Sequence, residues 1–111
     1  VIDVDIDPLA ITATHQNAAK NGIKKKQLFC YPPELLPQDI QADILIANIL
    51  AEPLTELASR FKKLTKSCGT ICLSGVLETQ ISYIQKNYEN EFKFKTPIIE
   101  EDWVLLEGKK L

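Results

Sequence analysis

The feature that most constrains this chain is a regular alternation of short apolar strands and amphipathic helices, joined by short connections. Apolar residues alternate with polar ones over residues 1–6, whereas 42–48 (ADILIAN) is almost continuously apolar, as expected for a strand covered on both faces. Apolar residues recur at helical spacing after Pro53 and again from Leu77. This alternation predicts an α/β fold whose sheet is mostly parallel.

Local signals place the ends of several elements. The dipeptide Asp7-Pro8 predicts a helix start, with the aspartate as N-cap, and Asn21-Gly22 predicts the end of that helix. The last two expected strands, 92–95 and 103–108, have no helix between them and should pair antiparallel. No linker or repeat interrupts the pattern, so we expect one domain over residues 1–111.

Composition adds further limits. The 13 basic and 15 acidic residues give no electrostatic case for binding nucleic acid, and no apolar run reaches the roughly 18–20 residues that span a bilayer. The three cysteines, an odd number without zinc-site spacing, favour a reducing, cytoplasmic setting, and we expect them to be small buried residues. The sequence contains no Met and opens directly in an apolar strand, so we expect a piece of a longer protein.

Ligands of parallel α/β sheets bind beyond the carboxyl ends of the strands. That rule selects these candidate residues: Asp5, Tyr31, Asn48 and the pair Ser74-Gly75. A lone Asn at a strand end is most often a turn residue, but at a binding edge its amide oxygen can accept hydrogen bonds from the N–H groups of an amine. An amine must be neutral to be alkylated, and an apolar pocket with a few acceptors favours its deprotonation.

The acidic cluster Asp3, Asp5 and Asp7 has three chemical interpretations. A calcium loop is excluded, because Pro8 replaces the required Gly and Thr14 replaces the acidic residue at the twelfth position. An aspartyl phosphotransferase could use Asp3 as nucleophile and Asp5 as acid, although Asp7 departs from the usual pattern. Alternatively, Asp5 accepts two hydrogen bonds from the vicinal hydroxyls of an adenosine ribose.

Four stretches of the chain, in order, resemble the ribosomal protein L-eleven methyltransferase family (PrmA), which are class I S-adenosylmethionine-dependent protein methyltransferases. They are DVDIDPLAITATHQNAAKNG, ADILIANILAEPLTELA, GTICLSGVL and EEDWVLLEGKK. The resemblance covers nearly the whole chain. It implies a Rossmann-like class I methyltransferase sheet with an antiparallel C-terminal hairpin. It also implies cytoplasmic methylation of lysine side chains and the N-terminal amine of a ribosomal protein, without a metal.

By the same resemblance, Asp5 would bind the ribose of the cofactor S-adenosylmethionine. Asn48 would be the catalytic residue, beside the methionine part of the cofactor and the target amine, and Leu50 would line the substrate entrance. The chain departs from the family at Asp3, where a small residue is usual, and it lacks the first strand and the Gly-rich cofactor loop. We therefore expect residues 1–111 to be the C-terminal portion of a catalytic domain, inactive alone, whose sheet the rest of the chain or a second copy completes.

Three alternatives remain open at this point. They are a Rossmann-like methyltransferase of another substrate class, the aspartyl phosphotransferase, and a non-catalytic remnant that binds a partner. No direct nucleic-acid partner and no membrane are expected. His15, the only histidine, is expected to be a partly exposed helix residue, and Trp103 a packing residue on the last strand.

Overall fold

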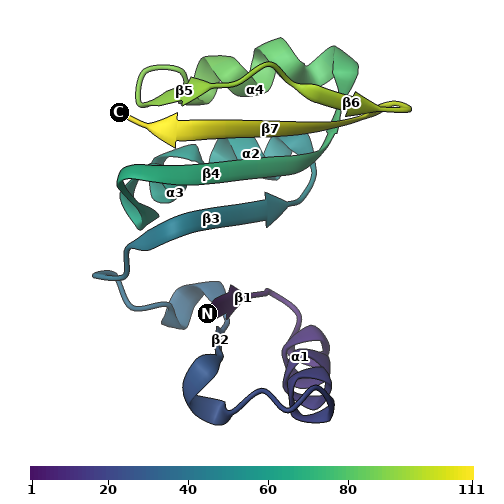
Figure 1. The fold of residues 1–111 in the computed structure, drawn as a ribbon, viewed down its shortest axis with the longest axis vertical. Helices are drawn as coiled ribbons and strands as arrows, with labels where there is room; N and C mark the ends of the chain where they lie inside the picture. The colour runs from purple at the N-terminus through teal and green to yellow at the C-terminus, as the bar shows by residue number, and fades with distance from the viewer. The chain divides into compact units, whose positions relative to one another are not determined.

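A computed structural model describes residues 1–111, which form two compact units, residues 1–40 and residues 41–111. Each unit has its own β-sheet, and Figure 1 shows the elements of both. None of the helices is long and apolar enough to cross a membrane.

The first unit contains two short parallel strands and one long helix. Its elements are β1 (Ile2–Val4), α1 (Pro8–Lys20), β2 (Phe29–Tyr31) and the 3-10 turns η1 (Lys25–Gln27) and η2 (Pro33–Leu35). The predicted start of α1 is confirmed, because an Asp7 carboxylate oxygen accepts a 2.9 Å hydrogen bond from the Leu9 amide. The predicted end is confirmed by Gly22, whose φ of +72° is the left-handed conformation that favours glycine. None of the side chains of α1 is buried.

The second unit is built on a five-stranded sheet in the order β3-β4-β7-β5, with β6 also paired to β7. Its strands are β3 (Ala42–Asn48), β4 (Thr65–Leu77), β5 (Phe92–Phe94), β6 (Ile98–Glu100) and β7 (Trp103–Lys110). Its helices are α2 (Ala51–Glu56), α3 (Ala58–Leu64) and α4 (Ile81–Tyr88), with a 3-10 turn η3 (Glu78–Gln80). β3 and β4 are parallel, and β4, β5 and β6 are antiparallel to β7. The predicted α/β class and antiparallel C-terminal strands are therefore confirmed, and β6 is an additional strand.

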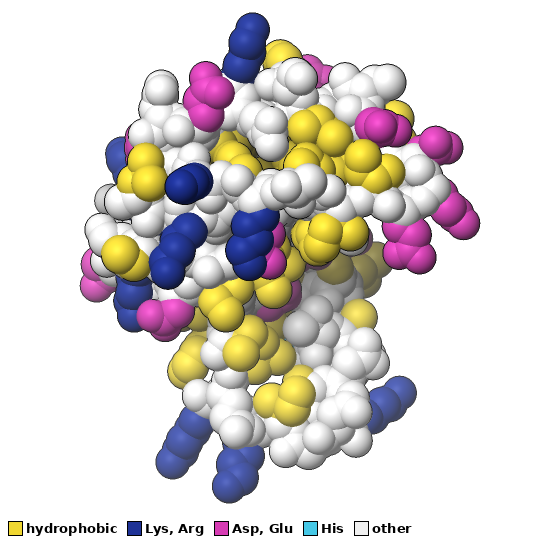
Figure 2. All heavy atoms as spheres, turned by 45° about the horizontal axis from the view of Figure 1, so that its top comes forward, with side chains coloured by type: hydrophobic (Ala, Val, Ile, Leu, Met, Phe, Trp, Pro, Cys, Tyr) yellow, Lys and Arg dark blue, Asp and Glu magenta, His cyan; other side chains and the backbone are white.

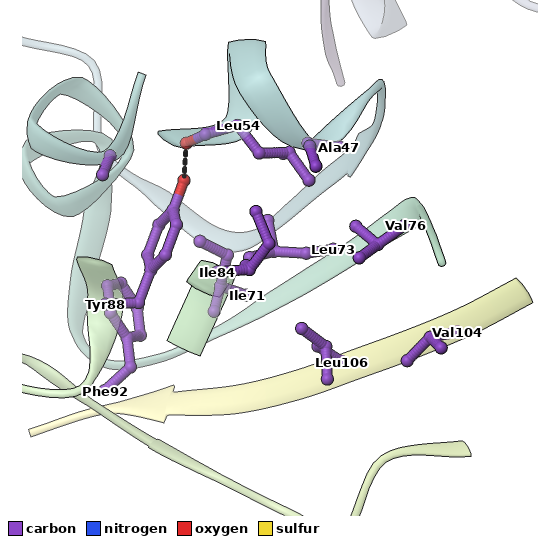
Figure 3. Close-up of a cluster of buried hydrophobic side chains, with 12 residues drawn as sticks. Ala47, Leu54, Ile71, Leu73, Val76, Ile84, Tyr88, Phe92, Val104 and Leu106 are labelled. Carbon is purple, nitrogen blue, oxygen red and sulfur yellow. Dashed lines mark hydrogen bonds between the residues drawn. The ribbon is translucent and has the colours of Figure 1, made fainter. Parts of the chain in front are cut away.

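The hydrophobic core of the second unit lies between one face of this sheet and its three helices. Side chains on one face of a strand alternate with those on the other, so Ile71 and Leu73 of β4 share a face with Leu106 of β7. These residues are fully buried and pack with the helical core residues Leu54, Ile84 and Tyr88 (Figure 3). Burying a large aliphatic side chain contributes about 1.5–3 kcal/mol, so this face holds the unit together.

Three expectations about the strands, helices and cysteines are wrong. β3 is covered on one face only: Ala47 belongs to the core, whereas Ile44 and Ile46 are 61% and 76% exposed, because the helices pack against the opposite face. The helix expected from Pro53 is divided into α2 and α3 at Leu57. The cysteines are not all buried, since Cys68 is exposed and the other two are only half-buried.

Candidate active site

A pocket of about 500 Å³ lies at the carboxyl ends of β3 and β4 in the second unit. Its lining residues are Asn48, Ile49, Leu50, Ser74, Gly75, Trp103 and Val104. Asn48 and Ser74 are register partners in the parallel ladder, so Ser74 lies beside the end of β3, whereas β4 continues to Leu77. The structure therefore brings together the strand-end residues predicted for this unit, together with Leu50.

Hydrogen bonding and close packing fix the polar end of this pocket. Ser74 Oγ donates a 2.8 Å hydrogen bond to Asn48 Oδ1. Gly75 has a φ of +85°, and a Cβ at this position would lie 2.5 Å from the carbonyl oxygen of Ile49 and 3.1 Å from Asn48 Oδ1. Only glycine fits here without displacing the backbone that carries Asn48.

Two large apolar side chains flank the pocket. Leu50, the residue before α2, is 68% exposed, and Trp103, the first residue of β7, is 54% exposed. The expectation that Trp103 is a packing residue is wrong. Trp103 is the register partner of Leu77, and this antiparallel pairing brings the start of β7 to the carboxyl end of β4. The sequence predicted this antiparallel strand but not its pairing with β4, so it gave no signal that Trp103 lies at this pocket.

An acidic groove adjoins the pocket. A second hollow, of about 480 Å³, shares Leu50, Gly75 and Trp103 with the first and adds Glu52 and Glu56 of α2. No Lys, Arg or His lines either hollow. The turn before Trp103 carries three more exposed acids (residues 100–102), and Figure 2 shows acidic side chains gathered on the side where Figure 1 places the β6–β7 turn. The surroundings of the pocket therefore suit a cationic ligand.

Cys72 lies on the same face of β4 as Ser74, two residues before it. Burial and the Glu107 carboxylate raise the pKa of the Cys72 thiol. The thiol therefore stays protonated at neutral pH and is a poor nucleophile. The polar chemistry at this edge of the sheet belongs to Asn48 and Ser74.

Asp5 follows β1 in the first unit, beside the end of β2. Its amide donates a 3.2 Å hydrogen bond to the carbonyl oxygen of Tyr31, and its Oδ1 accepts a 2.9 Å hydrogen bond from the Asp7 amide. This second bond orients the carboxylate and leaves Oδ2 for a ligand. Asp3, by contrast, has a buried Oδ2, and its carboxylate lies close enough to the Cys30 thiol to help burial raise the pKa of that thiol.

The family model described as ribosomal protein L11 methyltransferase (PrmA) matches residues 1–111, the whole chain. The chain belongs to the ribosomal protein L11 methyltransferase family. A family member from Nitrosococcus oceani is 47% identical over 109 residues, and one from Aeromonas hydrophila is 42% identical over 111 residues. The two matches cover 98% and 100% of this chain, respectively. They cover only 37% and 38% of the length of the two ribosomal protein L11 methyltransferases.

Solved structures agree with this assignment. The ribosomal protein L11 methylase from Lactobacillus delbrueckii subsp. bulgaricus is 30% identical with a TM-score of 0.87, and the match covers 100% of this chain and 58% of that one. An RNA methyltransferase from Salinibacter ruber, solved in complex with S-adenosyl-L-homocysteine, has a TM-score of 0.73 at 12% identity, over 98% of this chain and 64% of its own. At that identity the likeness is one of fold. The predicted class I methyltransferase fold is therefore confirmed.

Proposed function

We propose that the protein to which residues 1–111 belong transfers a methyl group from S-adenosylmethionine to amino groups of a ribosomal protein, both lysine side chains and the N-terminal amine. The observation that carries this proposal is the pocket in which Ser74 donates a hydrogen bond to Asn48 and which the apolar residues Leu50 and Trp103 also line. Membership of the methyltransferase family supports the reaction class. We also assign both compact units to the C-terminal portion of one catalytic domain.

Asn48 is the proposed catalytic residue. Its Oδ1 accepts one hydrogen bond from Ser74 and retains a second lone pair for an N–H of the target amine. Alkylation needs the neutral amine, and the apolar walls at Leu50 and Trp103 disfavour the ammonium form by desolvation. The same contact orients the nitrogen lone pair, so proximity and alignment supply much of the acceleration.

Asp5 is the proposed ribose-binding residue. Its Oδ1 is oriented by the Asp7 amide, so Oδ2 is available to accept hydrogen bonds from vicinal hydroxyls, which is the role of an acid at the end of a strand in nucleotide-binding sheets. When bound, S-adenosylmethionine supplies the activated methyl group on its sulfonium. Within the first unit the oriented carboxylate of Asp5 suits a ribose, and within the second unit the acceptor of Asn48 suits a methyl-accepting amine.

The proposed substrate class follows from the negative charge of the groove beside the pocket. A lysine-bearing segment is cationic, and the groove beside the pocket presents Glu52 and Glu56 with no basic side chain. A ribosomal protein as the partner also places the reaction in the cytoplasm, with neither a membrane nor a direct nucleic-acid contact.

The test uses the protein expressed from its complete gene, with labelled S-adenosylmethionine and a recombinant ribosomal protein as substrates. We expect Asn48→Ala to lower kcat by about a hundredfold, which is within the range that removal of a positioned catalytic group produces. Cofactor affinity by calorimetry should stay within twofold of the starting protein, since Asp5 is intact. Asn90→Ala, at an exposed position after α4, is the matched control and should leave both quantities unchanged. Unchanged transfer in Asn48→Ala would refute the assignment.

A further inference from the structure

We propose that Ser74 is a positioning residue that fixes the carboxamide of Asn48 for methyl transfer, an inference that rests on the proposed function. Its Oγ donates a 2.8 Å hydrogen bond to Asn48 Oδ1. The two residues are register partners in the parallel β3–β4 ladder, so the backbone hydrogen bonds of the sheet set where the hydroxyl lies. The donor is thus provided by a rigid strand.

Asn48 needs such a donor because its side chain is exposed at the end of a strand. The terminal torsion of Asn is broad and roughly two-fold, so a free carboxamide presents its NH2 group about as readily as its oxygen. An NH2 group turned toward the substrate would donate to the amine nitrogen and occupy the lone pair that must attack the methyl group. In the structure this bond runs from Ser74 Oγ to Asn48 Oδ1, and it holds the orientation in which the second lone pair of the oxygen is available to an incoming N–H.

The next residue of β4 constrains the same site through its backbone. Gly75, at a φ of +85°, approaches the carbonyl oxygen of Ile49 so closely that a Cβ would lie 2.5 Å from it. Two consecutive residues of β4 therefore contact the end of β3 and the connection to α2. Ser74 orients the side chain of Asn48, and Gly75 allows the backbone of Ile49 to approach β4 closely.

The experiment is a double-mutant cycle in the protein expressed from its complete gene. We expect Ser74→Ala to lower kcat about three- to tenfold, the worth of one neutral hydrogen bond, with the KM for S-adenosylmethionine unchanged. Ser74→Thr keeps the hydroxyl at a half-buried strand position that suits a β-branched residue, and it should retain the starting kcat within twofold. In an Asn48→Ala background, Ser74→Ala should change kcat by less than twofold, because its effect passes through the carboxamide. Ser82→Ala, at an exposed position of α4, is the control.

Each result supports or overturns the inference. Equal losses from Ser74→Ala in both backgrounds, or a Ser74→Thr protein that folds normally but is as slow as Ser74→Ala, would mean that Ser74 has only a structural role. A slow Asn48→Ala protein combined with an unimpaired Ser74→Ala protein would overturn the positioning role and leave the proposed function standing. If Asn48→Ala does not slow transfer, the proposed role of Asn48 fails, and the inference fails with it.

Discussion

The hydroxyl of Tyr88 donates a 2.6 Å hydrogen bond to the backbone carbonyl oxygen of Leu54, and both residues are fully buried (Figure 3). Leu54 lies in the last turn of α2, where carbonyl groups lose their helical partners because the helix stops at Glu56. The phenol of α4 therefore provides a donor for a carbonyl group at the end of α2. This contact joins the helix that follows Asn48 to the core of the second unit.

Tyr88→Phe should destabilise the protein by about 1–3 kcal/mol, because the buried carbonyl of Leu54 loses its side-chain donor while the ring remains packed. The measurement is the free energy of unfolding from urea denaturation. Tyr83→Phe is the matched control: Tyr83 is 55% exposed in the same helix, and its replacement should change stability by less than about 0.5 kcal/mol. Equal effects of the two changes would contradict the role given to the Tyr88 hydroxyl.

Stability at alkaline pH should depend on the same phenol. Burial raises the pKa of Tyr88 above its ordinary value, so the folded state holds this proton more tightly than the unfolded state does. The resulting stabilisation is fully present below about pH 10, the pKa of an unfolded tyrosine, and is lost as the pH rises from there toward the raised pKa. Unfolding free energies between pH 8 and pH 11 should therefore fall more steeply in the starting protein than in Tyr88→Phe. Parallel curves would show that this phenol does not contribute.

Asp5→Ala should weaken the binding of S-adenosylmethionine by at least about tenfold, because hydrogen bonds to a charged group contribute about 1.5–3 kcal/mol. Calorimetry on the protein from the complete gene measures the affinity. Asp7→Ala is the matched control: it removes the N-cap of α1, at a cost of about 1 kcal/mol in stability, but leaves the ribose carboxylate in place. Unchanged affinity in Asp5→Ala would refute the ribose assignment.

The parts of the fold that sequence reasoning predicted are those specified by local chemistry. Asp7-Pro8 and Asn21-Gly22 bound α1 through side-chain capping and a left-handed glycine, both of which can be read from neighbouring residues. The break between α2 and α3 could not be found this way, because Leu57 continues the apolar stripe and its non-helical backbone depends on tertiary packing. β6 is only three residues long, too short for periodicity to identify.

The residues of the candidate site likewise include some that the sequence predicts and some that depend on tertiary packing. Asn48 and Ser74-Gly75 were selected because the carboxyl ends of neighbouring parallel strands must meet, and they line one pocket. Trp103 was missed because its exposure depends on which strand β7 pairs with. The exposure of Ile44 was missed for a related reason, since an apolar run does not say whether one face or two will be covered.

Reversing charge in the groove should weaken the binding of a basic substrate. We expect Glu52→Lys or Glu56→Lys to raise the KM for the ribosomal protein about two- to fivefold each, the range of single exposed ion pairs, with little change in kcat. The effect should shrink as salt is added, because salt screens exposed charges. Glu89→Lys, an exposed position at the end of α4, is the control of equal charge change. If it raises KM as much as the groove variants do, only net charge matters and the groove is not the docking site.

Two glycines with positive φ allow steric crowding at the site to be separated from backbone strain. Gly22 has a φ of +72° with nothing within 4 Å of an added Cβ, so Gly22→Ala should cost only the strain of the left-handed conformation, about 1–2 kcal/mol. Gly75→Ala carries the same strain and also places a methyl group 2.5 Å from the carbonyl oxygen of Ile49, which is backbone and cannot rotate away. We expect a cost of about 2–5 kcal/mol for Gly75→Ala, since overpacking adds about 1–3 kcal/mol to the strain. Urea denaturation measures both costs, and equal values would mean that the β3–α2 connection yields to the methyl group. The folded fraction of Gly75→Ala should also transfer methyl groups more slowly, because the displaced backbone carries Asn48.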